Sequence, residues 1–419
     1  MSDSVSPKSA AFYGWRIVAG AFVVAVFGWG LGFYGPPVYL HTVREARGWS
    51  IALTSTAVTV HYLCGALVVA NLPKLYRRFG LANVTRAGSL SLSLGLIGWA
   101  VADLPWQLFA ATLLTGCGWV TLGAAAINAI VAPWFVRHRP KALSTAYNGA
   151  SVGGIIFSPL WVALIEWLGF AKATMLVGIV TVAVTWWLAT MVVSRTPEQL
   201  GQRPDGEATV PSISTMPGLD IAALPGRMLW HNRQFQTLAA GMALGLFAQI
   251  GLLAHLFSLI VPALGTGWAG IAAGLATAAA IVGRTAFGWL MPTGADRRLW
   301  AAMSYTIQIV GIGALMLSGL QSQVMILVGV LLFGFGIGNA TSFPPLIAQV
   351  EFAKEDAVRV VPLIVAMAQA TYAFAPAAFG LIREAWPIAI WPVLIVAALI
   401  KAVAIAAFLN GRRKGSDLA

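Results

Sequence analysis

Charged residues are scarce in this sequence. Asp, Glu, Lys and Arg make up 10% of its 419 residues, whereas 59% of the residues are apolar. Soluble proteins carry about 25% charged residues, and so few charges cannot cover a surface that faces water. The composition therefore excludes an ordinary soluble protein. It favours a chain that lies in a lipid bilayer, as do its seventeen Trp and forty-four Gly.

Several chemical signatures are also missing. Neither GxxxxGKS nor GxxxxGKT occurs, which excludes an ATP-driven motor with that phosphate-binding loop. Cys64 and Cys117 lie within apolar runs, so no disulfide framework is expected, and no Cys/His spacing suits a metal. Carboxylates are few, and Asp103 and Glu166 fall at the ends of apolar runs. We expect no enzymatic activity, no cofactor and no metal.

Apolar runs long enough to cross a bilayer recur along the chain. A transmembrane helix needs about 20 mostly apolar residues, and helices satisfy their own backbone hydrogen bonds in lipid. The first run is too long for a cleavable signal, so we expect it to be retained. We predict an all-α integral membrane protein whose twelve transmembrane helices form two pseudo-symmetric six-helix bundles. The predicted spans are 15–40, 51–73, 87–103, 106–135, 142–168, 173–194, 236–263, 269–292, 299–320, 324–349, 360–382 and 388–409.

The net charge of +12 is spread over short basic clusters between these runs. That distribution argues against nucleic-acid binding, which needs a basic face. If both termini are cytoplasmic, the segments on that side hold 20 Lys and Arg, against four in the outer loops: Arg44, Arg47, Lys172 and Arg383. The positive-inside rule then places both termini in the cytoplasm. We expect a multi-pass protein of the cell membrane, in a bacterium the inner membrane.

One long hydrophilic segment divides the chain. It begins RTPEQLGQRPDGEATVPS and contains Pro, Gly and charges of both signs. We predict an N-terminal bundle over residues 1–194, a cytoplasmic linker over 195–233 and a C-terminal bundle over 234–419. The end of the linker, LPGRMLWHNRQF, is expected to form a short amphipathic helix on the membrane surface.

The two predicted bundles repeat a basic loop. LPKLYRRFG follows the second helix and LMPTGADRR follows the eighth, as expected of parallel repeats. Both loops resemble the signature loop of the major facilitator superfamily, which usually contains an Asp-Arg pair between glycines. The first copy lacks the Asp, with Lys74 or Leu75 near its place. The second copy ends in Asp296, Arg297 and Arg298.

Four further segments resemble the monocarboxylate transporters and the bacterial oxalate/formate antiporters. They are FYGWRIV, APWFVRHRPKALSTAYNGASVGGIIFSPLWVALIEWLGF, GLLAHLFSLIVPALG and VGRTAFGW. The second is the most specific, because it keeps that family's Trp-Phe pair, two basic residues and a small-residue helix. Ser158 replaces the first Pro of the usual Phe-Pro-Pro, and Pro140 stands where Gly is usual. The resemblance spans nearly the whole chain and implies a transporter of small carboxylates.

Arg284 lies within the apolar run of the predicted eighth helix. A charge at the bilayer centre costs at least about 2.5–3.5 kcal/mol on insertion scales, and neither Ala280 nor Gly288, one turn away, supplies a carboxylate. The planar guanidinium matches a carboxylate with two hydrogen bonds. The resembling family binds the substrate carboxylate with an Arg at this position, so we expect the same of Arg284. The alternatives are pairing across the bundle or snorkelling to the cytoplasmic end.

Two histidines also lie in predicted helices. His255, in LLAHLF, stands where the resembling family has a His near the central cavity, and is a candidate for substrate binding and proton coupling. His61, in VTVHYLCG, is a second candidate for proton coupling. His can change its charge near neutral pH, although either residue could instead be a hydrogen-bonded packing residue.

Neutral polar residues complete the candidate substrate site. They are Tyr34, Asn128, Tyr147, Asn339, Gln369 and Tyr372. Each alone is more often a helix–helix hydrogen bond than a ligand contact. The oxalate-transporting members carry a Lys where Gln369 aligns, so the resemblance implies one cationic site here and favours a monocarboxylate over a dianion.

The expected function is secondary active transport of a small organic anion by alternating access. The expected partners are that anion, protons or a counter-anion, and the lipid bilayer, with the chain acting as a monomer. Two alternatives stay open. One is an exporter of amphipathic or aromatic compounds, which a buried carboxylate would favour. The other is a non-transporting receptor with the same fold, supported only by the degenerate first signature loop.

The charge count yields a test of topology. Gln199→Cys, in a chain whose Cys64 and Cys117 are replaced by Ser, should react with a membrane-impermeant maleimide only from the cytoplasmic side. Lys172→Cys in the same background should react only from outside. The opposite labelling pattern would contradict the predicted orientation.

Overall fold

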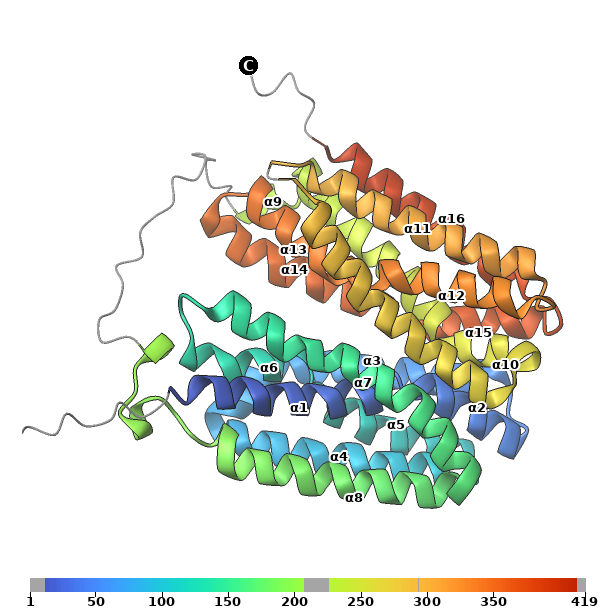
Figure 1. Cartoon of the computed structure of the whole chain (residues 1–419), viewed down its shortest axis with the longest axis horizontal. Helices are drawn as coiled ribbons and strands as arrows, with labels where there is room; N and C mark the ends of the chain where they lie inside the picture. The colour runs from blue at the N-terminus through green and yellow to red at the C-terminus, as the bar shows by residue number, and fades with distance from the viewer. Residues whose placement is uncertain (1–11, 207–225, 293, 413–419) are drawn as a thin grey trace, which may run out of the picture.

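Helices fill the described part of the chain, residues 12–206, 226–292 and 294–412 of the computed structural model. Eleven helical segments there are long and apolar enough to cross a membrane. The longest, α10 (Arg233–Leu290), contains Gly265, whose φ of 75° and ψ of 165° are not helical. Its two arms therefore cross separately (Figure 1), and the described residues supply the twelve predicted crossings.

The first half of the molecule contains six crossings. Its helices are α1 (Gly14–Gly32), α2 (Pro36–Arg47), α3 (Ile51–Phe79), α4 (Leu81–Val101), α5 (Pro105–Val120), α6 (Ala124–Val131), η1 (Ala132–Trp134), α7 (Arg139–Leu168), α8 (Phe170–Leu188) and the π-helical η2 (Ala189–Val193). Short helices follow in the linker, namely η3 (Glu198–Leu200), η4 (Pro204–Gly206) and α9 (Gly226–Leu229). The second half contains α10, α11 (Arg297–Ser318), α12 (Gln323–Ile337), α13 (Asn339–Glu351), α14 (Lys354–Tyr372), α15 (Ala375–Ala385) and α16 (Trp391–Asn410).

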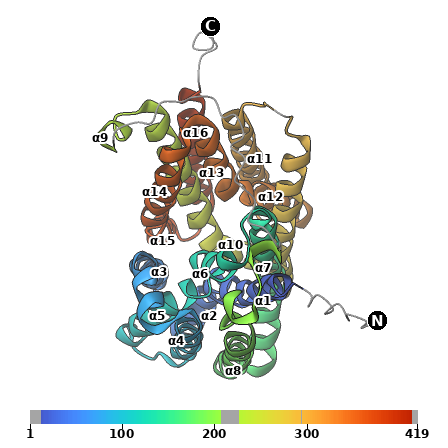
Figure 2. The ribbon, with the colours of Figure 1, turned by 90° about the vertical axis from the view of Figure 1, so that its left-hand side faces the viewer.

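The two halves form two helical bundles that lie side by side (Figures 1 and 2). The start of α1, the described parts of the linker and the end of α16 share one face of the molecule, called the linker face here (Figure 1). The first and last helices thus begin and end on the same side, as predicted. The charge count predicts that the linker face is cytoplasmic.

Four crossings are broken near their middle. The breaks lie at residues 33–35 between α1 and α2, 121–123 between α5 and α6, 338 between α12 and α13, and 373–374 between α14 and α15. Proline explains the first break, because Pro36 and Pro37 lack the N–H that would continue the helix from α1. At these breaks, backbone N–H and C=O groups in the interior of the protein lack helical partners, and side chains can bind them.

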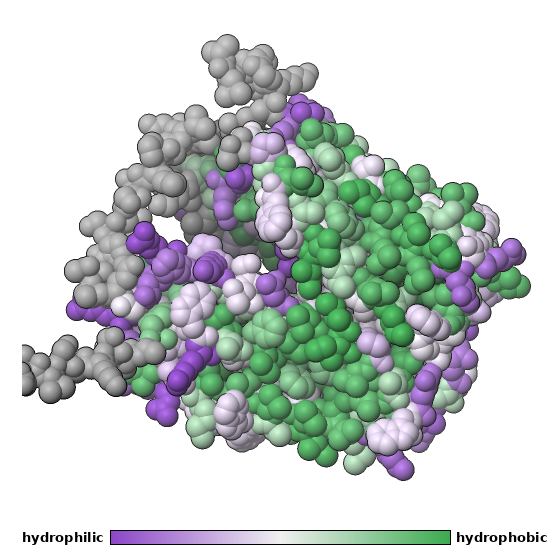
Figure 3. All heavy atoms as spheres, viewed as in Figure 1, coloured by the Kyte–Doolittle hydropathy of each residue, from purple (hydrophilic) through white to green (hydrophobic). Residues whose placement is uncertain are grey.

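The halves contact one another mainly toward the face opposite the linker. There α7 packs on α10, α3 on α15, and α2 on α10. Thr266 donates a hydrogen bond to Glu166, and the backbone N–H of Ala52 donates to Glu384 at 2.7 Å, so each half contributes one carboxylate. On the linker side, α6 and α13 have their main packing partners within their own halves. Figure 3 shows the molecule hollowed there between the halves, with hydrophilic residues near the mouth and a broad apolar belt beyond it.

The basic loop after the eighth crossing forms a buried ion pair. Arg298, 1% exposed, donates from Nε and Nη2 to the Glu351 carboxylate at 2.6 and 2.7 Å. Asp296 accepts from the first backbone N–H groups of α11 and pairs with Arg412 at 2.5 Å. In the first half the predicted basic loop LPKLYRRFG is helical instead, because α3 continues to Phe79 and α4 begins at Leu81. The prediction of a matching loop in both halves is therefore wrong for the first half.

The structure corrects the predicted placement of three arginines. Arg44 and Arg47, assigned above to an outer loop, lie in the last turn of α2, and Arg383 lies in the last turn of α15. Hydropathy ended these helices too early because the charged residues lowered the local average.

The start of the linker is attached to the first half by a carboxylate. Asp205 accepts hydrogen bonds from the backbone N–H of Val136, Arg137 and His138 at 3.0, 2.7 and 3.1 Å, just before α7 begins. Partial burial would raise the pKa of Asp205, but these hydrogen bonds stabilise its anion, and the pKa is lowered. The carboxylate thus holds the segment that leads into the fifth crossing, beside the positive N-terminal end of that helix; we call this contact the linker cap.

Asp205→Asn should lower the thermal stability of the purified protein, because a weaker acceptor replaces the cap, at a cost of about 1 kcal/mol. Since the folded pKa is lowered, the stabilisation is present above the ordinary Asp value of 3.8 and is lost as the pH falls through the lowered value. Glu198→Gln is the matched control, because Glu198 is fully exposed and, among the described residues, interacts with Thr196 and its own backbone. Equal unfolding temperatures for the two variants would contradict the cap.

Candidate functional site

Arg284 lies on the second arm of α10, beside the break of the tenth crossing. Its Nε donates to the backbone carbonyl of Gly338 at 3.3 Å. Gly283 permits this approach, since a Cβ there would stand 1.9 Å from the carbonyl oxygen of Phe335 on α12. Among the described residues, no carboxylate forms an ion pair with Arg284. The guanidinium is half-buried and keeps donors for a further partner.

Tyr34, a residue of the first half, lies near Arg284. It lies in the break between α1 and α2, and its hydroxyl interacts electrostatically with Arg284. It also lies near the side chain of Thr277, two turns before Arg284 on the same arm of α10. Gly154 on α7 allows this contact, because a Cβ there would lie 2.6 Å from Thr277 and 2.7 Å from Tyr34.

Two more tyrosines join the halves at this level. The rings of Tyr62 on α3 and Tyr372 at the end of α14 meet edge to face, with centroids 6.0 Å apart. Tyr62 also interacts with Tyr34 and packs against Phe33 and Trp119. Sequence analysis selected Tyr34 and Tyr372 but missed Tyr62 and Thr277. The signal for Tyr62 was the His-Tyr pair in the middle of an otherwise apolar run.

Two of the predicted amides lie beside this group. Asn339 follows Gly338 directly, is 2% exposed, and its Nδ2 has no hydrogen-bond partner among the described residues. Gln369 lies one turn before Tyr372 on α14 and is half-buried. The structure therefore gathers five of the predicted site residues and the two missed ones around three helix breaks, at residues 33–35, 338 and 373–374. We call this set the Arg284 cluster: Tyr34, Tyr62, Thr277, Arg284, Asn339, Gln369 and Tyr372.

Asn128 and Tyr147 form a separate group nearer the linker face. Asn128 Oδ1 accepts from Arg139 Nη2 at 3.1 Å, and the Tyr147 hydroxyl donates to the carbonyl of Ala124 at 3.0 Å. These contacts lie between α6 and the first turns of α7, and no described contact joins them to Arg284. The two residues belong to the wall of the first half rather than to the Arg284 cluster.

His61 is buried behind the Arg284 cluster. Its Nε2 bonds to the carbonyl of Gly32 and its Nδ1 to the hydroxyl of Thr115, both at 2.9 Å, while its ring stacks on Trp119. Gly32 belongs to the last turn of α1, and Pro36 cannot donate to its carbonyl. His61 therefore satisfies the backbone at the first helix break.

His255 is enclosed between α10 and α15. Its Nε2 bonds to the carbonyl of Pro376 at 3.0 Å, and Arg383 Nη1 lies 3.3 Å from its Nδ1 and 2.5 Å from Ser258 Oγ. An arginine has only donors, so Nδ1 accepts and Nε2 carries the proton. This arrangement keeps the imidazole neutral. Arg383, its partner, was not among the predicted site residues.

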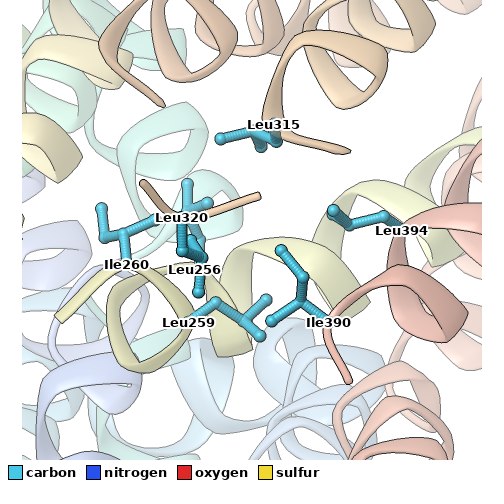
Figure 4. A pocket seen from close by; sticks show the side chains of 7 residues that line it. All are labelled: Leu256, Leu259, Ile260, Leu315, Leu320, Ile390 and Leu394. Carbon is cyan, nitrogen blue, oxygen red and sulfur yellow. The ribbon is translucent and has the colours of Figure 1, made fainter. Parts of the chain in front are cut away.

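A small cavity in the second half has an entirely aliphatic lining (Figure 4). Its walls come from α10, α11, the turn after α11, and the region around the start of α16. The lining residues are Leu256, Leu259, Ile260, Leu315, Leu320, Ile390 and Leu394. Without polar groups it offers nothing to an ion, and the Arg284 cluster is the better candidate site.

His255→Phe should lower the stability of the protein by about 1–3 kcal/mol, because the buried guanidinium of Arg383 loses an acceptor and the Pro376 carbonyl loses one of its donors. Thermal unfolding of the purified protein measures the loss. His138→Phe, the same replacement at an exposed His, is the control. An unchanged unfolding temperature for His255→Phe would show that the hydrogen-bonded contact contributes nothing.

Comparisons with known proteins agree with this architecture. Monocarboxylate transporter 11 of Mus musculus is 30% identical over 300 residues, which are 67% of this chain and 60% of that protein. The Homo sapiens protein is 28% identical over 67% of this chain and 57% of its own length, so the chain spans less than two thirds of both. MFS transporter asaE of Aspergillus flavus is 26% identical over 84% of this chain and 76% of that protein.

Solved structures share the fold at low identity. The nucleoside transporter NupG superposes with a TM-score of 0.73 over 95% of this chain and 100% of that chain, at 12% identity. A bacterial homologue of the lysosomal transporter Spinster gives a TM-score of 0.67 over 97% and 100%, at 13% identity. The sequence profile of the Major Facilitator Superfamily matches residues 17–376. The chain belongs to the Major Facilitator Superfamily.

Proposed function

We propose that this chain transports a small monocarboxylate by alternating access, coupled to protons or to exchange of a second anion. The observation that carries the proposal is Arg284, a membrane-embedded guanidinium with one backbone hydrogen bond and no carboxylate partner among the described residues. Burying such a group in a membrane interior is costly, so its presence there indicates a function. A bound carboxylate would supply the missing charge and accept two parallel hydrogen bonds.

The surroundings of Arg284 suit a small organic acid. The tyrosine hydroxyls of Tyr34, Tyr62 and Tyr372 can donate to carboxylate oxygens or to a polar tail, and the rings around them supply apolar walls. The name of the relatives, monocarboxylate transporter 11, supports the same substrate class. The fungal relatives are named only as transporters of the superfamily and add no substrate.

A charge argument connects binding to movement. Closing the hollow between the halves would bury Arg284 away from water, and an uncompensated charge resists that step. A bound monoanion neutralises the guanidinium and makes closure cheaper, so the loaded carrier changes conformation more readily than the empty one. The helix breaks at residues 33–35 and 338 border the cluster, and they provide places where the crossings can bend.

The same argument sets the preferred charge of the substrate. Gln369, beside Tyr372, is neutral, so a dicarboxylate at Arg284 would bury a second charge without a partner. Monocarboxylates should therefore bind better than oxalate.

Arg284→Ala and Arg284→Lys should both reduce uptake in proteoliposomes by about tenfold or more, because Lys keeps the charge but lacks the planar fork. A panel of radiolabelled L-lactate, pyruvate, benzoate and oxalate, with lipid-only vesicles as blank, identifies the transported acids. Arg412→Lys, at an exposed arginine, is the control. Normal uptake by Arg284→Ala, or competition by oxalate equal to that by monocarboxylates, would contradict the proposal.

A further inference from the structure

A second cation is buried in the membrane part of the second half. Lys401, near the middle of α16, is 0% exposed. Its Nζ donates to the carbonyl of Gly245 at 3.3 Å and lies 4.9 Å from the ring centroid of Tyr305 and 5.7 Å from that of Phe333. Among the described residues no carboxylate pairs with it. The ammonium is held by one carbonyl and two aromatic faces.

Unsatisfied polar atoms collect around this lysine. Tyr305 Oη, Gln249 Oε1 and both amide atoms of Gln308 are buried without a hydrogen-bond partner among the described residues. They are near Lys401 because Tyr305 Oη touches Gly245, the residue whose carbonyl binds Nζ, and Gln249 follows one turn later. Buried polar groups in proteins nearly always have partners, protein or water, so this concentration of unpaired donors and acceptors marks a site rather than ordinary packing.

The unpaired polar atoms around Lys401 extend toward the Arg284 cluster. Gln308 lies against Gly336, where a Cβ would stand 2.8 Å from its Nε2, and Ser304 donates to the Gly336 carbonyl at 3.2 Å. Two residues further on, the Gly338 carbonyl binds Arg284. The break between α12 and α13 therefore has Arg284 on one side and the polar atoms around Lys401 on the other.

We propose that Lys401 is a proton-binding site of the transport cycle, alternating between a charged and a neutral amine. This inference rests on the proposed function. In the charged form Nζ donates to Gly245 and lies over the two rings, which attract a cation. In the neutral form its lone pair accepts from Tyr305 Oη or from water held by the two glutamines. Tyr305 is the one titratable side chain in contact with Lys401 among the described residues; α10 and α12 present a carbonyl, an amide and a phenyl ring.

Electrostatic attraction links Lys401 to Arg284. A proton on Lys401 adds a positive charge to the second half, and that charge favours an anion at Arg284. By reciprocity, a bound anion favours the proton on Lys401. The carrier therefore binds and releases the two together. Movement of one monocarboxylate with one proton is electroneutral symport, and it needs no buried carboxylate.

Lys401→Met and Lys401→Arg in proteoliposomes test the assignment, with Lys172→Met, at an exposed lysine, as control. Two quantities are measured with radiolabelled L-lactate: counterflow exchange at equal pH, and accumulation under an inward proton gradient of one pH unit. A trapped pH dye reports proton entry. Wild type should accumulate lactate by up to about tenfold, the ratio that one pH unit supports for one-to-one symport. Both Lys401 variants should exchange lactate normally but lose accumulation and substrate-linked proton entry.

The two variants protect the test against misfolding, because Lys401→Arg keeps the cation and its contacts while it removes the neutral form at accessible pH. Proton-driven accumulation by either folded variant at the wild-type level would overturn the assignment and leave the proposed function standing. Failure of wild type to exchange any monocarboxylate of the panel would overturn the proposed function, and the role of Lys401 with it.

Discussion

In the apolar interior of a bilayer, a backbone carbonyl that leaves its helix must find another donor. Two titratable side chains of this chain serve that need: His61 bonds to Gly32 at the end of α1, and Arg284 bonds to Gly338 between α12 and α13. A third, His255, bonds to the carbonyl of Pro376 in the first turn of α15. A helix break thus leaves a carbonyl that an ionisable side chain can bind, and this hydrogen bond stabilises both the break and the buried side chain.

These three groups differ in what they have left to offer. His61 and His255 use both ring nitrogens within the protein, and Arg383 keeps the second ring neutral. Arg284 uses one donor on Gly338, interacts electrostatically with Tyr34 and has further donors left for a ligand. A side chain that both supports a helix break and keeps free binding capacity is suited to sense a ligand, because ligand binding then acts directly on a place where the chain can bend.

Much of the fold followed from local sequence properties. Hydropathy predicted all twelve crossings, because an apolar run is a local property of the sequence. Arg284 was recognisable because a charge in an apolar run is costly. Its acceptor could not be predicted, since Gly338 lies 54 residues away. Arg383 was missed for a related reason: its partner His255 is 128 residues away, and hydropathy placed it in a loop.

The depth of a polar residue was equally beyond the sequence. Tyr147 lies in a segment that matches the family and Asn128 lies just before it, yet the structure pairs them with Ala124 and Arg139 nearer the linker face. Tyr62 stands beside His61 in the sequence but points to the other tyrosines rather than to Thr115. A change of one residue along a helix turns a side chain by about 100°. Sequence alone therefore predicts the depth of a site in the membrane better than it predicts which residues form the site.

The distribution of charge between the halves bears on the alternative of an exporter of amphipathic compounds. Such a carrier would need an unoccupied carboxylate in the membrane to hold a cation. Glu351 is bound by Arg298, and Glu166 and Glu384 accept hydrogen bonds where the halves meet at the face opposite the linker. In the described interior, Arg284 instead lies beside Tyr34 of the first half, and Lys401 is enclosed within the second half by Gly245, Tyr305 and Phe333. An anion fits that polarity and a cation does not, because either buried positive charge would repel it before any contact with the aromatic walls could form.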